Sequence, residues 1–224
     1  MKHRSHPLAF VSVAAAAGAG LSLVGFGALS CSNKVEAGGS GQTLYSSSEQ
    51  LGPEKQPGWN AVLLYQDWEV PVQVEQKVEG NDITLRLLAK SQELEVERYR
   101  STPSQFQLVQ AASEQFTPPL PLLEFPLAEG DLPKWSGKLI FGELEKEATA
   151  IVEVRKAPLN VKGYNEEGVK AVVKVSFDGG GPKETVRVLN FWFVPGRGIL
   201  KREYEKGTTR IPAPPGVPSE GKAG

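Results

Sequence analysis

The sequence predicts an all-β protein, built as a curved antiparallel sheet or half-barrel with at most one short helix near its start. Three observations support this fold class. Between Glu69 and Glu205, apolar and polar residues alternate with a period of two in one segment after another, as strands with one buried face do. Glycine, proline and asparagine separate these segments at the spacing of turns. The third observation accounts for the short helix: over Trp59–Trp68 the apolar residues have a helical spacing.

The segment Trp59–Trp68 is where a short helix is expected. Its apolar residues fall at i, i+3, i+4 and i+7 and make one stripe, which consists of Ala61, Leu64, Tyr65 and Trp68. A helix of this length needs tertiary packing to persist. A strand is the alternative.

Four alternating segments follow and predict the first group of strands. Their apolar members are Val70, Val72 and Val74; Ile83, Leu85 and Leu87; Leu94 and Val96; and Phe106 and Leu108. In the third segment the polar positions are held by Glu93, Glu95 and Glu97. Charged residues are rarely buried without partners, so we expect this row of carboxylates to be a solvated strand face.

A proline-rich crossover, Thr117–Pro126, precedes a second group of strands. The clearest alternation there runs from Val169 to Asp178, and Gly179–Gly181 turns it into the next strand as a hairpin. We therefore expect the domain to continue as antiparallel strands as far as Glu205.

The strand ending at Val194 is continuously apolar, so both of its faces must be covered. Its aromatic residues are candidates for lining a ligand cavity: Phe191, Trp192 and Phe193. A core position is the alternative, because aromatic side chains bury large areas.

The N-terminus has the pattern of an export signal. Lys2 and Arg4 precede an apolar, Ala/Gly-rich run that leads to Cys31, the single cysteine of the chain. This pattern resembles bacterial lipoprotein signals, and the resemblance implies that Cys31 is acylated, with palmitate as one expected chain. Two alternatives are a plain secretory signal cut near Ala28 and an uncleaved anchor, since about 20 apolar residues suffice to span a bilayer.

The predicted domain organisation has four parts. Residues 1–30 are a signal peptide and residues 31–58 a flexible Gly/Ser-rich tether. Residues 59–205 form one β-rich domain, for which two halves, 59–117 and 118–205, are the alternative. Residues 206–224 are a polar Pro/Gly-rich tail that we expect to be disordered.

Composition argues against several functions. The chain has 25 basic and 26 acidic residues, and loss of Lys2 and Arg4 with the signal leaves 23 against 26, a net charge of −3; we therefore expect no nucleic-acid partner. His3 and His6 are the only histidines. We predict no catalytic residue, no metal site and no cofactor in the exported part. A hydrolase that uses carboxylates alone is a remote alternative.

Two stretches carry a family resemblance. The first is Phe125-Pro126-Leu127 with Gly130-Asp131 and Trp135-Ser136-Gly137, and the second is Trp192-Phe193-Val194-Pro195-Gly196-Arg197-Gly198-Ile199-Leu200-Lys201. They resemble the opening and closing signatures of uncharacterised β-rich bacterial envelope lipoproteins. The general build is similar to the open half-barrels of lipoprotein-carrier proteins of the LolA/LolB kind. A likeness of fold implies no function by itself.

These observations predict an exported protein that is anchored through Cys31 to a bacterial membrane and faces the periplasm or the cell surface. Its domain is expected to be non-catalytic, not an enzyme, and to bind an apolar or lipid-like ligand. A structural or protein-interaction module of the cell envelope is the alternative.

Overall fold

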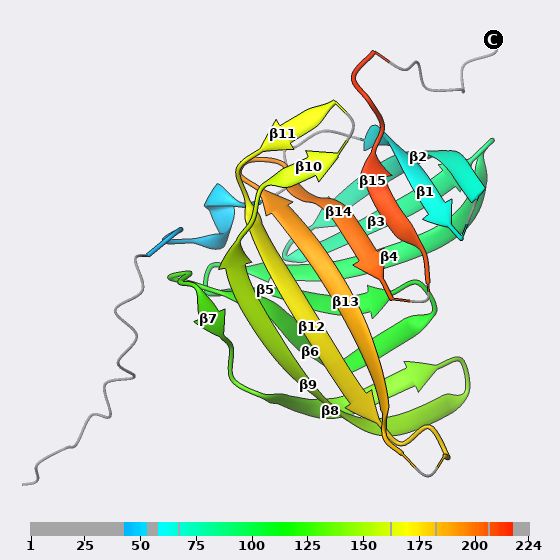
Figure 1. Ribbon diagram of the computed structural model, residues 1–224, viewed down its shortest axis with the longest axis vertical. Helices are drawn as coiled ribbons and strands as arrows, with labels where there is room; N and C mark the ends of the chain where they lie inside the picture. The colour runs from blue at the N-terminus through cyan, green and yellow to red at the C-terminus, as the bar shows by residue number, and fades with distance from the viewer. Residues whose placement is uncertain are drawn as a thin grey trace, which may run out of the picture. The chain divides into compact units, whose positions relative to one another are not determined.

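A closed antiparallel barrel of twelve strands dominates the described part of the chain (Figure 1). The computed structural model describes residues 43–52, 58–66, 68–161, 163–181, 183–205 and 207–216. Around the barrel the strand order is β12-β13-β14-β15-β1-β2-β3-β4-β5-β6-β8-β9, and β9 pairs again with β12. The strands of the barrel are β1 Gly58–Tyr65, β2 Trp68–Glu79, β3 Asp82–Ala89, β4 Gln92–Thr102, β5 Gln105–Ala111, β6 Glu114–Glu124, β8 Trp135–Phe141, β9 Leu144–Lys156, β12 Val169–Phe177, β13 Thr185–Val194, β14 Gly198–Tyr204 and β15 Thr209–Pro212.

Three short strands lie outside this ring. β7, Gly130–Asp131, pairs with the end of β9. β10, Leu159–Val161, and β11, Tyr164–Glu166, form a separate hairpin. Leu159 of this hairpin packs with Val194 and Leu200 in a small apolar cluster of its own.

The all-β class and the curved antiparallel sheet are confirmed, and the sheet curves far enough to close on itself. Every strand pair in the barrel is antiparallel and most neighbours are joined by short turns. The alternation predicted over residues 169–178 is confirmed in β12, whose buried residues are Val169, Ala171, Val173, Val175 and Phe177.

The helix expected over Trp59–Trp68 is wrong. The segment is β1 followed by the start of β2, with Ala61 and Leu63 buried in the barrel. β1 has hydrogen-bonded neighbours on both sides, β2 and β15. Two ladders of backbone hydrogen bonds outweigh a short apolar stripe that has weak helical stability of its own.

The tail predicted to be disordered contributes a strand to the barrel. Thr209–Pro212 form β15, which fills the place between β14 and β1. Arg210 of this strand is fully buried. The polar, proline-rich composition of the tail gave no signal for this four-residue strand, whose buried residues are an arginine and a proline.

Part of the predicted tether is also packed on the barrel. Residues 43–52, here named the cap segment, include the short 3₁₀ helix η1, Ser48–Gln50, which is the only helical element in the described ranges. Leu51 is fully buried in the main core. The Ser48 hydroxyl donates to the Thr102 carbonyl at 2.7 Å, and the Gly196 amide donates to the Gln50 carbonyl at 3.0 Å. The cap segment therefore covers the end of the barrel where the β4–β5 and β13–β14 turns lie.

Opposite walls of the barrel meet in its interior. The ring of Tyr99 on β4 lies 6.4 Å from that of Phe191 on β13, and the ring of Phe106 on β5 lies 5.3 Å from that of Phe193. Strands from both predicted halves contribute to this single ring and its core. In the described ranges no helix is long and apolar enough to span a membrane.

Candidate functional site

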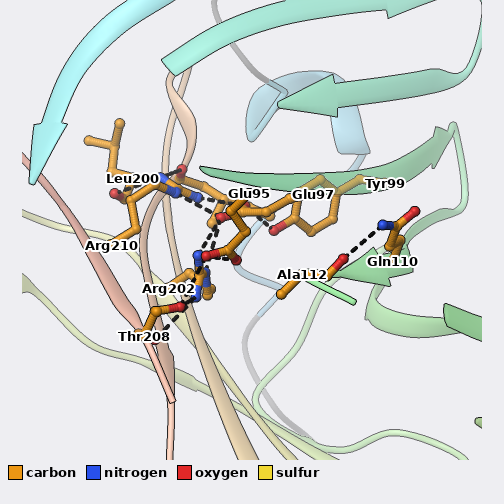
Figure 2. Close-up of polar contacts among 10 residues, drawn as sticks. Glu95, Glu97, Tyr99, Gln110, Ala112, Leu200, Arg202, Thr208 and Arg210 are labelled. Carbon is orange, nitrogen blue, oxygen red and sulfur yellow. Dashed lines mark hydrogen bonds and ion pairs between the residues drawn. The ribbon is translucent and has the colours of Figure 1, made fainter. Parts of the chain in front are cut away.

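Four charged side chains are buried together inside the barrel (Figure 2). Glu95 and Glu97 come from β4, Arg202 from β14 and Arg210 from β15. All four are at most 8% exposed. These residues, named the buried ion network, lie on facing walls, so their charges are brought together only by closure of the sheet.

Glu97 is the centre of the network. Its carboxylate accepts hydrogen bonds from Arg202 Nε at 3.0 Å, from Arg210 Nε and Nη2 at 3.0 Å each, and from the Tyr99 hydroxyl at 2.6 Å. Arg210 also donates to the carbonyls of Ile199 and Leu200 at 3.1 Å. A buried charge is tolerated when it is paired and fully hydrogen-bonded, and Glu97 meets both conditions.

Glu95 forms the outer part of the network. It accepts from Arg202 Nη2 at 2.5 Å and from the Thr208 hydroxyl at 3.1 Å. Arg202 Nη1 in turn donates to the Thr208 hydroxyl at 2.5 Å. Thr208 precedes β15, so the three side chains tie the β14–β15 turn to β4.

The two carboxyl groups have opposite pKa shifts. Burial alone would raise the pKa of Glu97, but the charges and hydrogen bonds of Arg210 and Arg202 outweigh it and lower the pKa to about 2. Burial raises the pKa of Glu95; Arg202 opposes this shift, while the negative charge of Glu97 adds to it. Glu95 is thus the member that protonates first as the pH falls.

The expectation that Glu93, Glu95 and Glu97 form a solvated face is wrong for the last two. Glu93 is exposed and pairs with Arg86 at 2.7 Å, whereas Glu95 and Glu97 point inward with Tyr99. Period-two alternation does not say which of its two faces is buried. The inward phase depends on Arg202, which follows Glu97 by 105 residues, and no local pattern signals that partner.

A cavity of about 810 Å³ opens at the end of the barrel opposite the cap segment. This mouth cavity is bordered by the starts of β4, β6 and β13, the ends of β1, β5 and β14, and the β14–β15 turn. Its lining residues are Tyr65, Glu93, Leu94, Glu95, Val96, Gln110, Ala112, Ser113, Glu114, Thr185, Val186, Arg187, Leu189, Tyr204, Glu205, Gly207 and Thr208. Glu95 and Thr208 join the cavity to the buried ion network.

The polar groups of the mouth are largely engaged with one another. Arg187 forms an ion pair with Glu114, and its guanidinium lies 5.1 Å from the ring centre of Phe141 and 5.6 Å from that of Phe177. The Gln110 amide donates to the Ala112 carbonyl at 2.7 Å. The buried Tyr204 hydroxyl, by contrast, has no hydrogen-bond partner among the described residues.

The aromatic candidates are separated by the alternation of β13. Phe191 and Phe193 are fully buried and fill the interior. Trp192 faces outward, with the ammonium groups of Lys170 and Lys201 at 4.4 and 4.1 Å from its ring centre. None of the three borders the mouth cavity. A ligand-lining role stays a prediction for them, while the core position named as its alternative describes Phe191 and Phe193.

Cys31 and the signal lie outside the described residues. Within the described ranges, no group of three or more His, Cys, Asp or Glu residues is arranged to hold a metal ion. The carboxylates at the mouth are instead matched with guanidinium groups, as in the pairs of Glu93 with Arg86 and Glu114 with Arg187.

No protein-family model and no curated protein matches the sequence. Among solved structures, the fold is similar to that of a predicted lipoprotein from Parabacteroides distasonis, which is 8% identical, with a TM-score of 0.46 over 72% of this chain and 95% of that one. It is also similar to a predicted exported protein with a YmcC-like fold from Bacteroides fragilis, which is 10% identical, with a TM-score of 0.45 over 72% and 96% of the two chains. Similarity at such low sequence identity concerns the fold alone.

Proposed function

We propose that this chain is an exported, membrane-tethered, non-catalytic binding protein that holds an amphiphilic ligand in the mouth cavity. The observation that carries the proposal is the cavity itself. Its volume of about 810 Å³ lies within the range of small-molecule sites. It is open at one end of a barrel whose other end is covered by the cap segment.

The lining supports a ligand with two kinds of surface. Leu94 and Val186 are exposed apolar residues at the rim, and Leu189 is a buried one deeper in the wall. Glu95 and Thr208 present carboxylate and hydroxyl oxygens at the floor. The middle of the barrel is filled with aromatic side chains, which favours a ligand seated at the mouth over one threaded through the sheet.

A binding role also fits the chemistry of the site better than an enzymatic one. Each of Glu93, Glu95 and Glu114 is ion-paired to an arginine. Catalysis by a pair of carboxyl groups needs both of them to reach the substrate. Of the two buried carboxyl groups only Glu95 lines the cavity, because Glu97 is fully buried behind it.

In this proposal the chain is attached to the membrane through a lipid on Cys31. The Cys31→Ser substitution is expected to move the chain from the membrane to the soluble exported fraction and to abolish labelling by a palmitate analogue. Serine cannot form the thioether on which the lipid is built. Unchanged labelling would show that the lipid is attached elsewhere. A variant that stays in the membrane without any labelling would show that the anchor is the apolar segment itself.

The binding proposal is tested on the exported full-length chain carrying Cys31→Ser, without detergent. Isothermal titration measures binding of three dodecyl amphiphiles below their micellar concentrations: dodecylamine, dodecanoate and dodecyl maltoside. At least one is expected to bind with one-to-one stoichiometry. Ser113→Trp, at the exposed rim of the cavity, is expected to weaken this binding at least tenfold. Ser104→Trp, in an exposed turn at the capped end, is the matched control and should leave it unchanged.

Two results would overturn the proposal: no binding by any of the three amphiphiles, or binding that Ser113→Trp leaves intact. Native mass spectrometry of the same protein, purified from its own envelope, then identifies the natural occupant.

A second candidate function, docking of an envelope protein at the mouth, is favoured by exposed apolar side chains there. The exposed residues near the mouth turns are Tyr65, Trp68, Leu94, Leu144 and Val186. Exposed apolar residues gathered in one region are typical of interaction surfaces. A photo-crosslinking residue at Trp68 would give one discrete adduct in intact cells if a protein docks there, and the same residue at Glu79, at the opposite end, would give none. Equal patterns from the two positions would rule against this candidate.

A further inference from the structure

We infer that the ligand of the mouth cavity is a cationic amphiphile whose ammonium-type head group is placed against Glu95. This inference rests on the proposed binding function and adds the sign of the ligand's charge and its orientation. It is carried by the charges that line the cavity and by the way each of them is already engaged.

Acidic side chains dominate the cavity lining. Glu93, Glu95, Glu114 and Glu205 are carboxylates, and Arg187 is the only cation among the described lining residues. The lining itself carries four negative charges against one positive. Arg86, Arg202 and Arg187 pair with three of these carboxylates, and Glu205 forms no ion pair among the described residues. A cleft lined by one sign of charge concentrates ligands of the other sign, because its low-dielectric walls focus the field.

The cations near the cavity are not available to an anion. Arg187 is paired with Glu114 and lies over two aromatic rings. Arg202, behind Glu95, is fully buried and donates to Glu95, Glu97 and Thr208. A fatty-acid carboxylate or a phosphate inside the cavity would have to displace a carboxylate from one of these guanidinium groups. Two further cations at this end of the barrel, Lys90 and Lys183, lie in exposed turns and do not line the cavity.

Glu95 can accept more hydrogen bonds than it receives. One of its oxygens is bonded to Arg202 and the other to Thr208. A carboxylate offers about four acceptor positions, so two remain for a ligand. The residue is 8% exposed and lines the cavity, whereas Glu97 is fully buried behind it. Charge-assisted hydrogen bonds from an ammonium group match these positions.

The distribution of apolar side chains sets the orientation. Tyr65, Leu94 and Val186 are about half exposed and border the cavity at its opening. Leu94 and Val186 alternate with the inward residues Glu95 and Arg187, so they form the outer edge of the rim. The polar floor and the apolar rim place the head group inside and the hydrocarbon tail toward the opening.

The same three amphiphiles test this inference by their ranking. Dodecylamine, protonated at neutral pH, is expected to bind about tenfold or more tightly than dodecanoate, with dodecyl maltoside between them. Raising the salt concentration should weaken dodecylamine binding and leave dodecyl maltoside binding unchanged.

Two variants locate the charge. Glu95→Gln is expected to weaken dodecylamine binding about tenfold and dodecyl maltoside binding by about threefold at most, because glutamine keeps an acceptor oxygen for a neutral head group but carries no charge. Because this residue also belongs to the buried ion network, circular dichroism first confirms that the variant is folded. Glu205→Gln is a second variant at an exposed residue, with an expected loss of about threefold. Glu79→Gln, exposed at the opposite end of the barrel, is the control and should change nothing.

The inference is overturned if dodecanoate binds as tightly as dodecylamine, or if dodecylamine binding survives both glutamate variants. In either case binding of a neutral or anionic amphiphile at the mouth would leave the proposed function standing. Failure of all three amphiphiles to bind would instead overturn the proposed function itself.

Discussion

Removing the charge of Glu97 by Glu97→Gln should destabilise the barrel more than any change to an exposed ion pair. The amide keeps the size of the carboxylate but loses its charge. In place of one acceptor oxygen it presents an NH₂ group to guanidinium donors. Arg210 then has no anionic partner, and Arg202 keeps only Glu95.

The expected cost follows from the environment of the carboxylate. The network lowers the pKa of Glu97 from its ordinary value of 4.5 to about 2. At 1.36 kcal/mol per pKa unit, this shift corresponds to roughly 3 kcal/mol of stability at neutral pH. Breaking a buried ion pair by removing one partner typically costs about 3–5 kcal/mol, and the cost obtained from the pKa shift lies at the lower end of this range. In a domain of this size the loss amounts to roughly 6–20 °C in melting temperature.

Urea and thermal unfolding of the exported chain, followed by circular dichroism, measure this loss. Glu79→Gln is the matched control, because Glu79 forms an exposed ion pair with Lys77 at 2.8 Å. Exposed pairs of this kind contribute little, and the control should stay within about 0.5 kcal/mol of the wild type.

The pH dependence has a definite sign. A carboxyl whose pKa is lowered on folding stabilises the folded state above its unfolded pKa and loses that contribution as the pH falls through its folded pKa. The difference between wild type and Glu97→Gln should therefore be complete above about pH 4.5 and shrink toward pH 2. A loss below about 1 kcal/mol at pH 7, or a difference that does not change between pH 4.5 and 2, would show that the ionised Glu97 carboxylate does not stabilise the barrel.

Two further substitutions test the cap segment and the unpartnered hydroxyl. Leu51→Ala should cost about 2–5 kcal/mol, because Leu51 is fully buried, and should speed hydrogen exchange of the Gly196 amide that donates to Gln50; unchanged exchange would mean that the cap segment is not held by Leu51. Tyr204→Phe should leave stability unchanged or raise it by up to about 1 kcal/mol, since the hydroxyl has no partner among the described residues; a clear loss in urea unfolding would reveal a bound water or another partner at that oxygen.

Much of the strand content could be predicted from local pattern. In β12 the alternation predicted the buried face residue by residue, from Val169 to Phe177. The Gly179–Gly181 turn into β13 was likewise predictable. In these segments one face is apolar and the other polar, so only one phase of the strand can be buried.

The same reasoning failed for β4, because from the sequence either of its two faces could be the buried one. Leu94 and Val96 favoured one phase, and the structure adopts the other, with Glu95 and Glu97 inside. A buried carboxylate is favourable only beside a cation. The cations here come from β14 and β15, more than a hundred residues along the chain.

The candidate site was almost entirely beyond sequence reasoning. Predicting the mouth cavity requires knowing that the sheet closes, that β15 belongs to it, and that residues 43–52 cover one end. Each of these depends on contacts between segments far apart in the sequence, and the segments themselves have the composition of linkers.

The sequence by itself therefore determined the all-β class and most of the strands and turns, β1 and β15 apart, because period-two alternation and turn residues act between near neighbours. It also predicts the export signal and Cys31, which are local patterns too. Tertiary structure decided the closure of the barrel, the inward phase of β4 and the acidic mouth. The physical reason is that the stability of a buried charge depends on its partners, and closure of the sheet alone brings Glu97, Arg202 and Arg210 together.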